Sequence, residues 1–209
     1  MESVVFDLDG VVVDTEKYWN RAEEKIYQNA TGEEVDVEKL AGMSITNTYE
    51  KLSEMHDPNV TRDEFFKMYE NRAEEIYGEK AELMDGLKDL ISELRSKDLK
   101  IGLATGSYWP KYVIDRFNLD FDTVVHSGNI EGKGKPEPET YLQAVQNMNI
   151  SPEDAVAVDD TGAGIQSAKG AGLYCIGYTS SGGSSPEGAD ETVEGPEELR
   201  DRLLELTER

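Results

Sequence analysis

The amino-acid sequence predicts an α/β protein with a doubly wound parallel sheet and a small α-helical insert. Two patterns predict the sheet: several short segments are apolar throughout, and segments with helical spacing separate them. Such strands are typical of a Rossmann-like parallel sheet that helices cover on both faces. A third pattern predicts the insert, because residues 14–77 show helical spacing alone. A chain of 209 residues is long enough for one such domain with an insert.

The predicted elements follow in order from the N-terminus. Val4-Val5-Phe6 is a short buried strand, and the turn-forming sequence Asp7-Leu8-Asp9-Gly10 ends it. The helical insert comes next, and beyond it helices and strands alternate. We expect helices at 86–97, 110–117, 138–148, 162–171 and from 196 onward, and strands at 100–104, 123–126, 155–158, 174–178 and 191–193.

The composition is that of a globular protein with a heavily charged surface, because 37% of the residues are hydrophobic and 31% are charged. No segment has the roughly 18–20 apolar residues that span a bilayer, and the N-terminus lacks the pattern of a signal peptide. The one cysteine, Cys175, cannot form an internal disulfide. We therefore expect a cytoplasmic protein that neither enters membranes nor needs more than a monomer, with a homodimer left open.

The charge balance is unusual, with 44 Asp and Glu residues against 21 Lys and Arg residues and a net charge of −23. Nucleic-acid binding is not expected, because it requires a basic face. Two interpretations remain: a docking surface for basic partners, or adaptation to high salt, where screening makes self-repulsion tolerable. The acidic residues are spread over the whole chain instead of forming one tail. Their spread favours the halophilic interpretation.

Polar side chains follow each of the predicted core strands at the point where ligands bind to open parallel sheets. Asp7 and Asp9 follow the first strand, and Thr105-Gly106-Ser107 follow the second. The third strand leads to Lys135-Pro136, and Asp159-Asp160 follow the fourth. The topology can therefore bring several carboxylates, a hydroxyl group and a lysine to one edge.

This set of groups predicts a magnesium site with a phosphate-binding site beside it. Carboxylates that lie close together need a cation to remain ionised, and oxygen ligands without His or Cys favour Mg²⁺. A lysine and a hydroxyl group beside the metal complement a tetrahedral dianion. The substrate group inferred from the residues is therefore phosphate, carried by a small molecule.

Four ordered motifs carry a resemblance to a known superfamily. They are Asp7-Leu8-Asp9-Gly10-Val11, Ala104-Thr105-Gly106-Ser107, Gly134-Lys135-Pro136-Glu137-Pro138 and Val158-Asp159-Asp160-Thr161. The sequence resembles the haloacid dehalogenase-like (HAD) hydrolases along essentially its whole length. Its helical insert is similar to the α-helical cap of phosphoglycolate phosphatases, β-phosphoglucomutases and sugar-phosphate phosphatases. The resemblance implies a HAD core domain at 1–14 and 83–209, a helical cap domain at 15–82 and strand order 5-4-1-2-3, with the first and fourth strands adjacent.

The resemblance also implies the role of each site residue. Asp7 is the nucleophile that becomes an aspartyl-phosphate, and Asp9 is the acid and base that protonates the leaving oxygen and activates water. The metal ligands are the Asp7 side chain, the Asp9 backbone carbonyl and the Asp160 side chain. The groups implied to bind the phosphoryl oxygens are Gly10, Thr105, Gly106 and Lys135, of which Thr105 and Lys135 also count as catalytic. Asp159 is expected to orient its neighbours or to bind the metal through water.

Two departures from the family pattern bear on the site. The fourth motif has Asp159 where the family often has Glu or Gly, which leaves open whether Asp159 contacts the metal directly. The second motif is followed by Tyr108-Trp109, whose rings either line the substrate entrance or pack against the cap. The run Gly162-Ala163-Gly164 is interpreted as a close approach of a helix to the fourth strand, because no Lys-Ser/Thr pair follows it as in a phosphate loop.

We therefore expect a Mg²⁺-dependent phosphatase for a small phosphate monoester, such as a sugar phosphate or phosphoglycolate. The alternative within the family is a β-phosphoglucomutase-like mutase, which typically has an arginine after a glycine in the cap to hold a second phosphate. The corresponding segment, Gly42-Met43-Ser44-Ile45-Thr46, has no arginine, which favours hydrolysis. A non-catalytic binding protein is a third alternative, disfavoured because every catalytic position is filled.

The halophilic interpretation predicts that the free energy of unfolding is larger in molar KCl than at low ionic strength, because salt screens the repulsion among the acidic residues. Denaturant unfolding curves over a KCl series measure it. Equal stability at both ends of the series would contradict salt adaptation.

Overall fold

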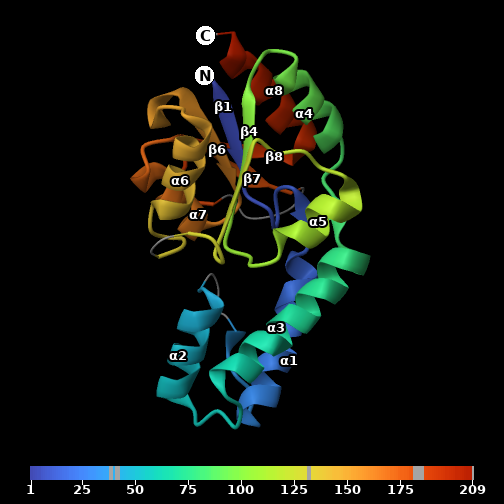
Figure 1. Cartoon of the computed structure of the whole chain (residues 1–209), viewed down its shortest axis with the longest axis vertical. Coiled ribbons are helices and arrows are strands. Elements are labelled where there is room, and N and C mark those ends of the chain that lie inside the picture. Colours follow the sequence, from blue (N-terminus) through green and yellow to red (C-terminus); the bar gives the residue numbers. More distant parts are fainter. Residues whose placement is uncertain (38–39, 41–42, 131–132, 181–185, 209) are drawn as a thin grey trace.

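The structure of the protein is a computed structural model that describes residues 1–37, 40, 43–130, 133–180 and 186–208. It consists of a sheet domain and a group of helices below it, and both chain ends lie at the far end of the sheet domain (Figure 1). Gly42, which belongs to the cap segment compared above, lies outside the described residues.

A six-stranded sheet forms the centre of the larger domain, in the order β5-β4-β1-β6-β7-β8, and all its neighbouring strands are parallel. The strands are β1 (Ser3–Phe6), β4 (Lys100–Thr105), β5 (Thr123–His126), β6 (Ala155–Asp159), β7 (Tyr174–Thr179) and β8 (Glu191–Glu194). The prediction of an α/β doubly wound sheet is confirmed. β1 lies between β4 and β6, so the first and fourth core strands are adjacent, as the resemblance implied.

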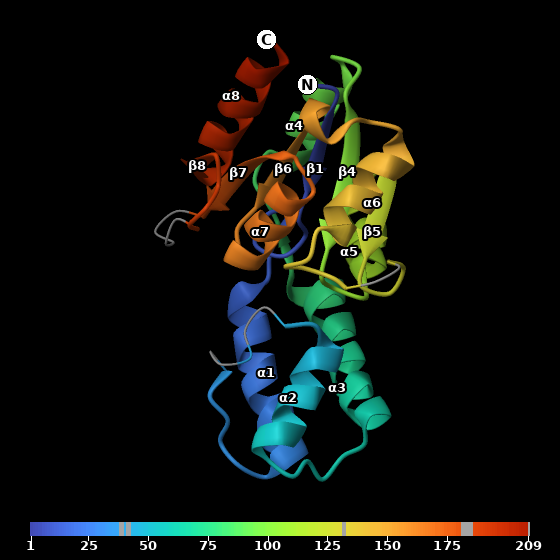
Figure 2. The ribbon, with the colours of Figure 1, turned by 90° about the vertical axis from the view of Figure 1, so that its left-hand side faces the viewer.

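Helices cover both faces of the sheet (Figures 1 and 2). One face carries α6 (Glu139–Met148) and α7 (Gly162–Gly170), and the other carries α4 (Leu87–Arg95), α5 (Pro110–Phe117) and α8 (Gly195–Thr207). A short 3-10 helix, η3 (Pro152–Asp154), precedes β6. Alternate β1 residues supply the two cores: Val4 and Phe6 pack with α4 and α8, while Val5 packs with α6 and α7.

The insert forms three helices, α1 (Glu16–Thr31), α2 (Ile45–Met55) and α3 (Arg62–Glu75), next to the carboxyl ends of the strands (Figure 1). Thr61 caps α3 in a reciprocal arrangement with Glu64, and Gly32 ends α1 in the left-handed conformation. The three helices enclose their own apolar cluster around Ile26, Leu52 and Phe65. This separate core supports the cap domain that the sequence predicted.

Two elements at the base of the cap were not predicted. The two-residue strands β2 (Val13–Asp14) and β3 (Glu82–Leu83) pair antiparallel, one in each connection to the sheet domain. A π-helix, η2 (Ile76–Lys80), continues α3 toward β3. Two residues are too few to show alternation, and a π-helix has no distinct spacing over one turn. The two paired strands lie at the boundaries that we propose for the cap domain, between residues 14 and 15 and between residues 82 and 83.

Aromatic side chains join the cap to the sheet domain. Phe66 of α3 contacts the rings of Tyr108 and Trp109, with centroids 5.0 and 5.2 Å away. The two bulky residues after the second motif therefore pack against the cap.

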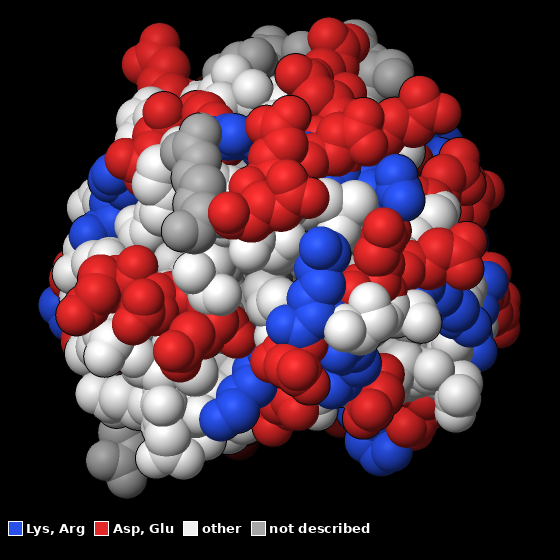
Figure 3. All heavy atoms as spheres, turned by 90° about the horizontal axis from the view of Figure 1, so that it is seen from above, with Lys and Arg blue, Asp and Glu red and all other residues white. Residues whose placement is uncertain are grey.

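Acidic side chains are spread over the surface of the sheet domain. On the face farthest from the cap, Asp and Glu outnumber Lys and Arg and form no single patch (Figure 3). None of the described helices is both long enough and apolar enough to cross a bilayer.

Candidate active site

The site forms where β1 and β6 end, and Lys135 is at its centre. Asp7 directly follows β1, and its backbone N–H donates to the carbonyl of Val158 on β6 (2.9 Å). The Lys135 Nζ donates to Asp7 Oδ1 at 2.5 Å and to Asp159 Oδ2 at 2.6 Å. The Lys135 side chain is only 9% exposed. One buried ammonium group thus bridges carboxylates from two neighbouring strands.

Further hydrogen bonds occupy both oxygens of Asp159. The Tyr141 hydroxyl donates to Oδ2 (2.7 Å), and the backbone N–H and hydroxyl of Thr161 donate to Oδ1 (2.9 and 2.8 Å). Gly164 lets α7 approach this carboxylate closely, because a Cβ on Gly164 would lie 1.9–2.1 Å from three of its atoms. Asp159 is therefore fully engaged in holding Lys135 and the loop before α7.

Asp160 has the opposite environment. Its Oδ1 is buried and has no hydrogen-bond partner among the described residues. Its Oδ2 lies against Gly10, where a Cβ would approach to 1.8 Å. Gly10 has a φ of +82°, which glycine adopts without strain. Gly10 of the first motif thus leaves room for the carboxylate of Asp160, whose Oδ1 has no partner among the described residues.

Burial and mutual repulsion raise the pKa values of these acids. Burial, opposed by Lys135 and reinforced by the charges of Asp159 and Asp9, raises the pKa of Asp7 to about 7. Burial and the charges of Asp7 and Asp159 raise the pKa of Asp160 to about 9. Burial would lower the pKa of Lys135, but Asp159 and Asp7 raise it instead. The single positive charge of Lys135 does not balance the negative charges of the carboxylates around it.

The carboxyl group of Asp9 is held by hydroxyl groups from the cap side. Thr15, just before α1, donates to Oδ1 (2.6 Å), and Tyr77 of η2 donates to Oδ2 (2.8 Å). Burial raises the pKa of Asp9, and the hydrogen bonds from Thr15 and Tyr77 oppose that rise. Asp7 and Asp9 are two residues apart, yet one is paired with a cation and the other with neutral donors.

Thr105 and Gly106 lie at the end of β4, beside β1. The Thr105 Oγ1 accepts a hydrogen bond from the Ser107 backbone N–H (3.0 Å), and the hydroxyl groups of Ser107 and Tyr77 form a hydrogen bond with each other (3.0 Å). The loop after β4 is thus joined to the cap and, through Tyr77, to Asp9. The predicted site residues Asp7, Asp9, Gly10, Thr105, Gly106, Lys135 and Asp160 all lie at the carboxyl edge of the sheet.

The residues present fit a magnesium ion. The unpaired buried oxygen of Asp160, the raised pKa values of Asp7 and Asp160 and the absence of a side chain at Gly10 all favour a small cation beside these oxygens. No cluster of three or more His, Cys, Asp or Glu side chains that could hold a metal occurs in the described part of the chain. The predicted ligand set does not need one, because it consists of two side chains, Asp7 and Asp160, and the backbone carbonyl of Asp9.

Two polar side chains of the cap, Glu23 and Arg62, have partners within the cap. The half-buried Glu23 accepts a hydrogen bond from Tyr69 (3.1 Å), which in turn contacts Tyr27 (3.0 Å). Burial raises the pKa of Glu23 to about 7, and the charge of Asp9 adds to this rise. At the start of α3, Arg62 donates to the hydroxyl of Thr46 (2.9 Å). Arg62 thereby brings an arginine to the cap segment that lacks one in sequence.

The sequence matches the family of haloacid dehalogenase-like hydrolases over residues 4–178. This chain belongs to that family. The match confirms the resemblance and the prediction of a HAD-like enzyme of the phosphoric monoester hydrolase type.

Relatives of this hydrolase include a Bacillus subtilis protein named beta-phosphoglucomutase, which is 30% identical, with 98% of this chain and 94% of that protein covered. A Thermotoga maritima protein named phosphorylated carbohydrates phosphatase is 27% identical, with 84% of each chain covered. The crystal structure of beta-phosphoglucomutase from Clostridium difficile has the same fold, with a TM-score of 0.80, 22% identity and coverage of 99% of this chain and 96% of that one.

Sequence reasoning missed several residues of the hydrolase site. Tyr77 and Tyr141 reach carboxylates from helices distant in the chain, and a tyrosine at helical spacing has no signal that distinguishes it from a core residue. In the cap, the contact of Arg62 with Thr46 was missed for the same reason. Thr15 could have been found, because a hydroxyl residue six positions after Asp9 stands at the start of the predicted insert.

Gly164→Ala is expected to destabilise the hydrolase by about 1–3 kcal/mol, because the new methyl group overlaps the Asp159 carboxylate. Gly162→Ala is the matched control, since a Cβ there meets nothing within 4 Å at the same helix end. Denaturant unfolding measures both variants. Equal stability of the two would contradict the close approach of α7 to Asp159.

Proposed function

We propose that the protein is a Mg²⁺-dependent phosphatase that hydrolyses a small sugar phosphate or a related monoester through an aspartyl-phosphate on Asp7. The observation that carries the proposal is the contrast between Asp7 and Asp9. Asp7 is paired with Lys135, whereas Asp9 is held by the hydroxyls of Thr15 and Tyr77. Two carboxyl groups in different environments suit two different roles in one reaction.

In the proposed mechanism, an oxygen of Asp7 attacks phosphorus while the bond from phosphorus to the leaving oxygen breaks. Asp9 gives its proton to that oxygen, so the leaving group departs as a neutral alcohol. Water then attacks the aspartyl-phosphate, and Asp9 takes the proton of that water. Inorganic phosphate leaves, and Asp7 is regenerated. The raised pKa of Asp9 supports this exchange, because its proton must be both available and recoverable.

Thr105, Lys135, Gly10 and the backbone N–H group of Gly106 are proposed to bind the phosphoryl oxygens. Lys135 would turn from a carboxylate-bridging role to a partner of the phosphoryl group, with Asp159 and Tyr141 holding its amine. Asp159 is proposed to orient Lys135 and not to bind the metal, because four hydrogen bonds occupy its oxygens.

A bound Mg²⁺ would be held by the side chains of Asp7 and Asp160 and by the backbone carbonyl of Asp9. When bound, it supplies positive charge that offsets the carboxylates and the transferring phosphoryl group. The unpaired oxygen of Asp160 supports this assignment.

The cap is proposed to select the leaving group. Glu23 would repel a leaving group that carries a carboxylate, as in phosphoglycolate, but its oxygens can accept hydrogen bonds from a sugar or polyol. The relative named phosphorylated carbohydrates phosphatase supports the same choice. We further propose a cytoplasmic monomer adapted to high salt, as the composition suggests.

The Asp7→Asn variant is expected to lose at least about 10³-fold in kcat for p-nitrophenyl phosphate with Mg²⁺, because an amide cannot act as the nucleophile. Chelation of the metal should abolish turnover by the unaltered protein. Asp14→Asn is the control, since Asp14 is exposed and pairs only with Lys17 among the described residues, and it should retain full activity. If Asp7→Asn hydrolysed p-nitrophenyl phosphate as fast as the unaltered protein, the covalent route through Asp7 would be ruled out.

A sugar-phosphate mutase is the second candidate function, and Arg62 is the observation that favours it. Its guanidinium lies at Thr46, in the segment where mutases carry a phosphate clamp. The relative named beta-phosphoglucomutase supports this candidate as well.

If the protein is a mutase, it should convert β-glucose 1-phosphate to the 6-phosphate, and Arg62→Gln should reduce that conversion by about 10-fold or more, because a charge-assisted phosphate contact is lost. Hydrolysis of p-nitrophenyl phosphate should be unchanged in the variant. Coupled detection of glucose 6-phosphate measures the conversion. If free glucose and phosphate are the only products, the phosphatase stands alone.

Glu23→Gln is expected to raise kcat/KM for phosphoglycolate by about 10-fold relative to glucose 6-phosphate, because the repulsion between carboxylates is removed. Glu24→Gln is the matched control, since Glu24 is the exposed neighbour of Glu23 on α1. Initial rates on both substrates measure the ratio. An unchanged ratio in Glu23→Gln would show that Glu23 does not meet the leaving group.

A further inference from the structure

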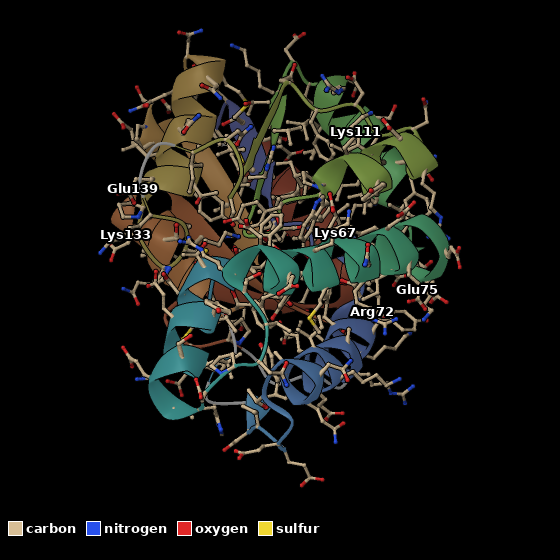
Figure 4. All side chains as sticks on the ribbon, turned by 60° about the horizontal axis from the view of Figure 1, so that its bottom comes forward. Lys67, Arg72, Glu75, Lys111, Lys133 and Glu139 are labelled. Carbon is tan, nitrogen blue, oxygen red and sulfur yellow. The ribbon has the colours of Figure 1, made fainter. Side chains whose placement is uncertain are left out.

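A cavity of about 220 Å³ lies on the side of the cap between α1, α3 and η2. Four cationic side chains line it: Arg21 and Lys25 from α1, Arg72 from α3 and Lys80 from η2. Glu75 is the only acidic residue among the described residues of its lining, and Tyr18 contributes an aromatic ring. Figure 4 shows Arg72 and Glu75 near the end of α3, on the side where α1 lies.

The charge of this cavity is the reverse of the rest of the molecule. Acidic residues outnumber basic ones 44 to 21 in the chain, whereas the cavity lining has four basic residues and one acidic residue. A second groove of about 320 Å³ shares Lys25 and Arg72 and adds the amides of Asn29 and Asn71 without any acid. In a protein with a net charge of −23, this cluster of cations differs in sign from the average surface.

Only part of this positive charge is neutralised within the protein. Glu75 pairs with Arg72 (2.7 Å) and with Lys80 (2.5 Å). The side chains of Arg21 and Lys25 have no ion pair or hydrogen bond with any other residue that the structure describes. Two cations in the lining of the cavity are therefore available to a ligand.

The cavity is separate from the catalytic edge. The lining residues of α1, Tyr18, Arg21 and Lys25, are spaced three or four residues apart and lie on one face of the helix. Glu23, which accepts a hydrogen bond from Tyr69, lies on a different face. None of the proposed catalytic residues lines it. A ligand could thus bind there while a substrate occupies the active site.

One element is common to the cavity and the active site. Ile76 and Lys80 of η2 line the cavity, and Tyr77, which lies between them in the chain, donates a hydrogen bond to Asp9 (2.8 Å). η2 is a single π-helical turn, a conformation that is frequently found at functional sites. A ligand held by Lys80 would therefore act on the same turn that positions the acid and base.

We propose that this cavity is a regulatory anion site that binds a phosphate group, and that its occupancy alters catalysis through η2 and Tyr77. Arginine forks and lysine ammonium groups are the usual partners of a phosphate group. The cavity is smaller than the roughly 300–1,000 Å³ of sites for drug-sized ligands, which favours a small anion over a polymer. The regulatory part of this proposal rests on the proposed phosphatase activity, but the binding part does not.

Calorimetric titration with inorganic phosphate, without Mg²⁺ and at constant KCl concentration, tests the binding. The double variant Arg21→Gln/Lys25→Gln removes the two unpaired cations, both of which are exposed. Its affinity for phosphate at this site should fall about 10-fold or more. Lys88→Gln/Lys97→Gln, which changes two exposed lysines at α4, is the matched control and should bind as the unaltered protein does.

Binding at the catalytic site is separated with Lys135→Met, which removes the buried catalytic cation. Phosphate binding that survives Lys135→Met and is lost when Arg21→Gln/Lys25→Gln is added to that variant supports the proposal. Binding that is lost in Lys135→Met and unchanged in the Arg21/Lys25 variant overturns it. If Lys135→Met does not fold, the stoichiometry decides: the Arg21/Lys25 variant should bind one phosphate fewer than the unaltered protein, and an equal number overturns the proposal.

Kinetics test the regulatory part. Phosphate as a product should raise the KM for p-nitrophenyl phosphate by competition in every active variant. A change in kcat with phosphate should occur in the unaltered protein and disappear in the Arg21/Lys25 variant. The same kcat dependence in both overturns the regulation. No turnover in either would contradict the proposed function and leave the binding result intact.

The source of the phosphate group is distinguished with methylphosphonate, which a phosphatase cannot hydrolyse. Binding of methylphosphonate as tight as that of phosphate shows that the site admits a phosphoryl group attached to an organic residue, and binding of phosphate alone indicates the free ion. If neither anion binds in a manner that depends on Arg21 and Lys25, the proposal is wrong.

Discussion

At the carboxyl edge of the sheet, the ammonium group of Lys135 lies between the carboxylates of Asp7 and Asp159. Burying such charges costs several kcal/mol per ion unless each finds partners. Asp159 finds them in Tyr141 and Thr161, which hold one carboxylate firmly in place. Asp160 does not, and its unpaired oxygen leaves the edge short of positive charge. The carboxylates of the site thus outnumber its positive charges. A bound metal ion can supply the missing positive charge, and a phosphoryl group can take the place of a carboxylate as a partner of Lys135.

The second constraint is the position of Asp9 between the two domains. Asp9 belongs to the sheet domain, but Thr15 and Tyr77, at the two chain connections to the cap, hold its oxygens. The hydroxyl of Tyr77 also reaches Ser107 in the loop after β4. Any movement of the cap that displaces η2 therefore displaces a hydrogen bond to Asp9, the proposed proton carrier. The proposed selection of the leaving group by the cap and the proposed proton transfer would then be linked through the same few contacts.

The surface charge bears on both the candidate active site and the proposed anion site. With a net charge of −23, the protein attracts cations and repels anions in general. A phosphate ester therefore needs local positive charge, and the chain provides it in two places. Lys135 provides it within the buried edge, and Arg21, Lys25, Arg72 and Lys80 provide it on the side of the cap. High salt would weaken the repulsion over the surface more than the contacts of the buried lysine.

The sequence by itself determined the doubly wound sheet, the helical cap and the places where Asp7, Lys135 and Asp160 occur. It could do so because apolar strands, helical spacing and strand-end polar motifs are local patterns along the chain. Tertiary structure alone decided the partners of those residues. Tyr77 and Tyr141 approach carboxylates from helices 68 and 18 residues away in the chain, and Arg62 reaches Thr46 from another helix. These contacts depend on how the helices pack, and a single tyrosine or arginine on a helix carries no local signal of what it will meet.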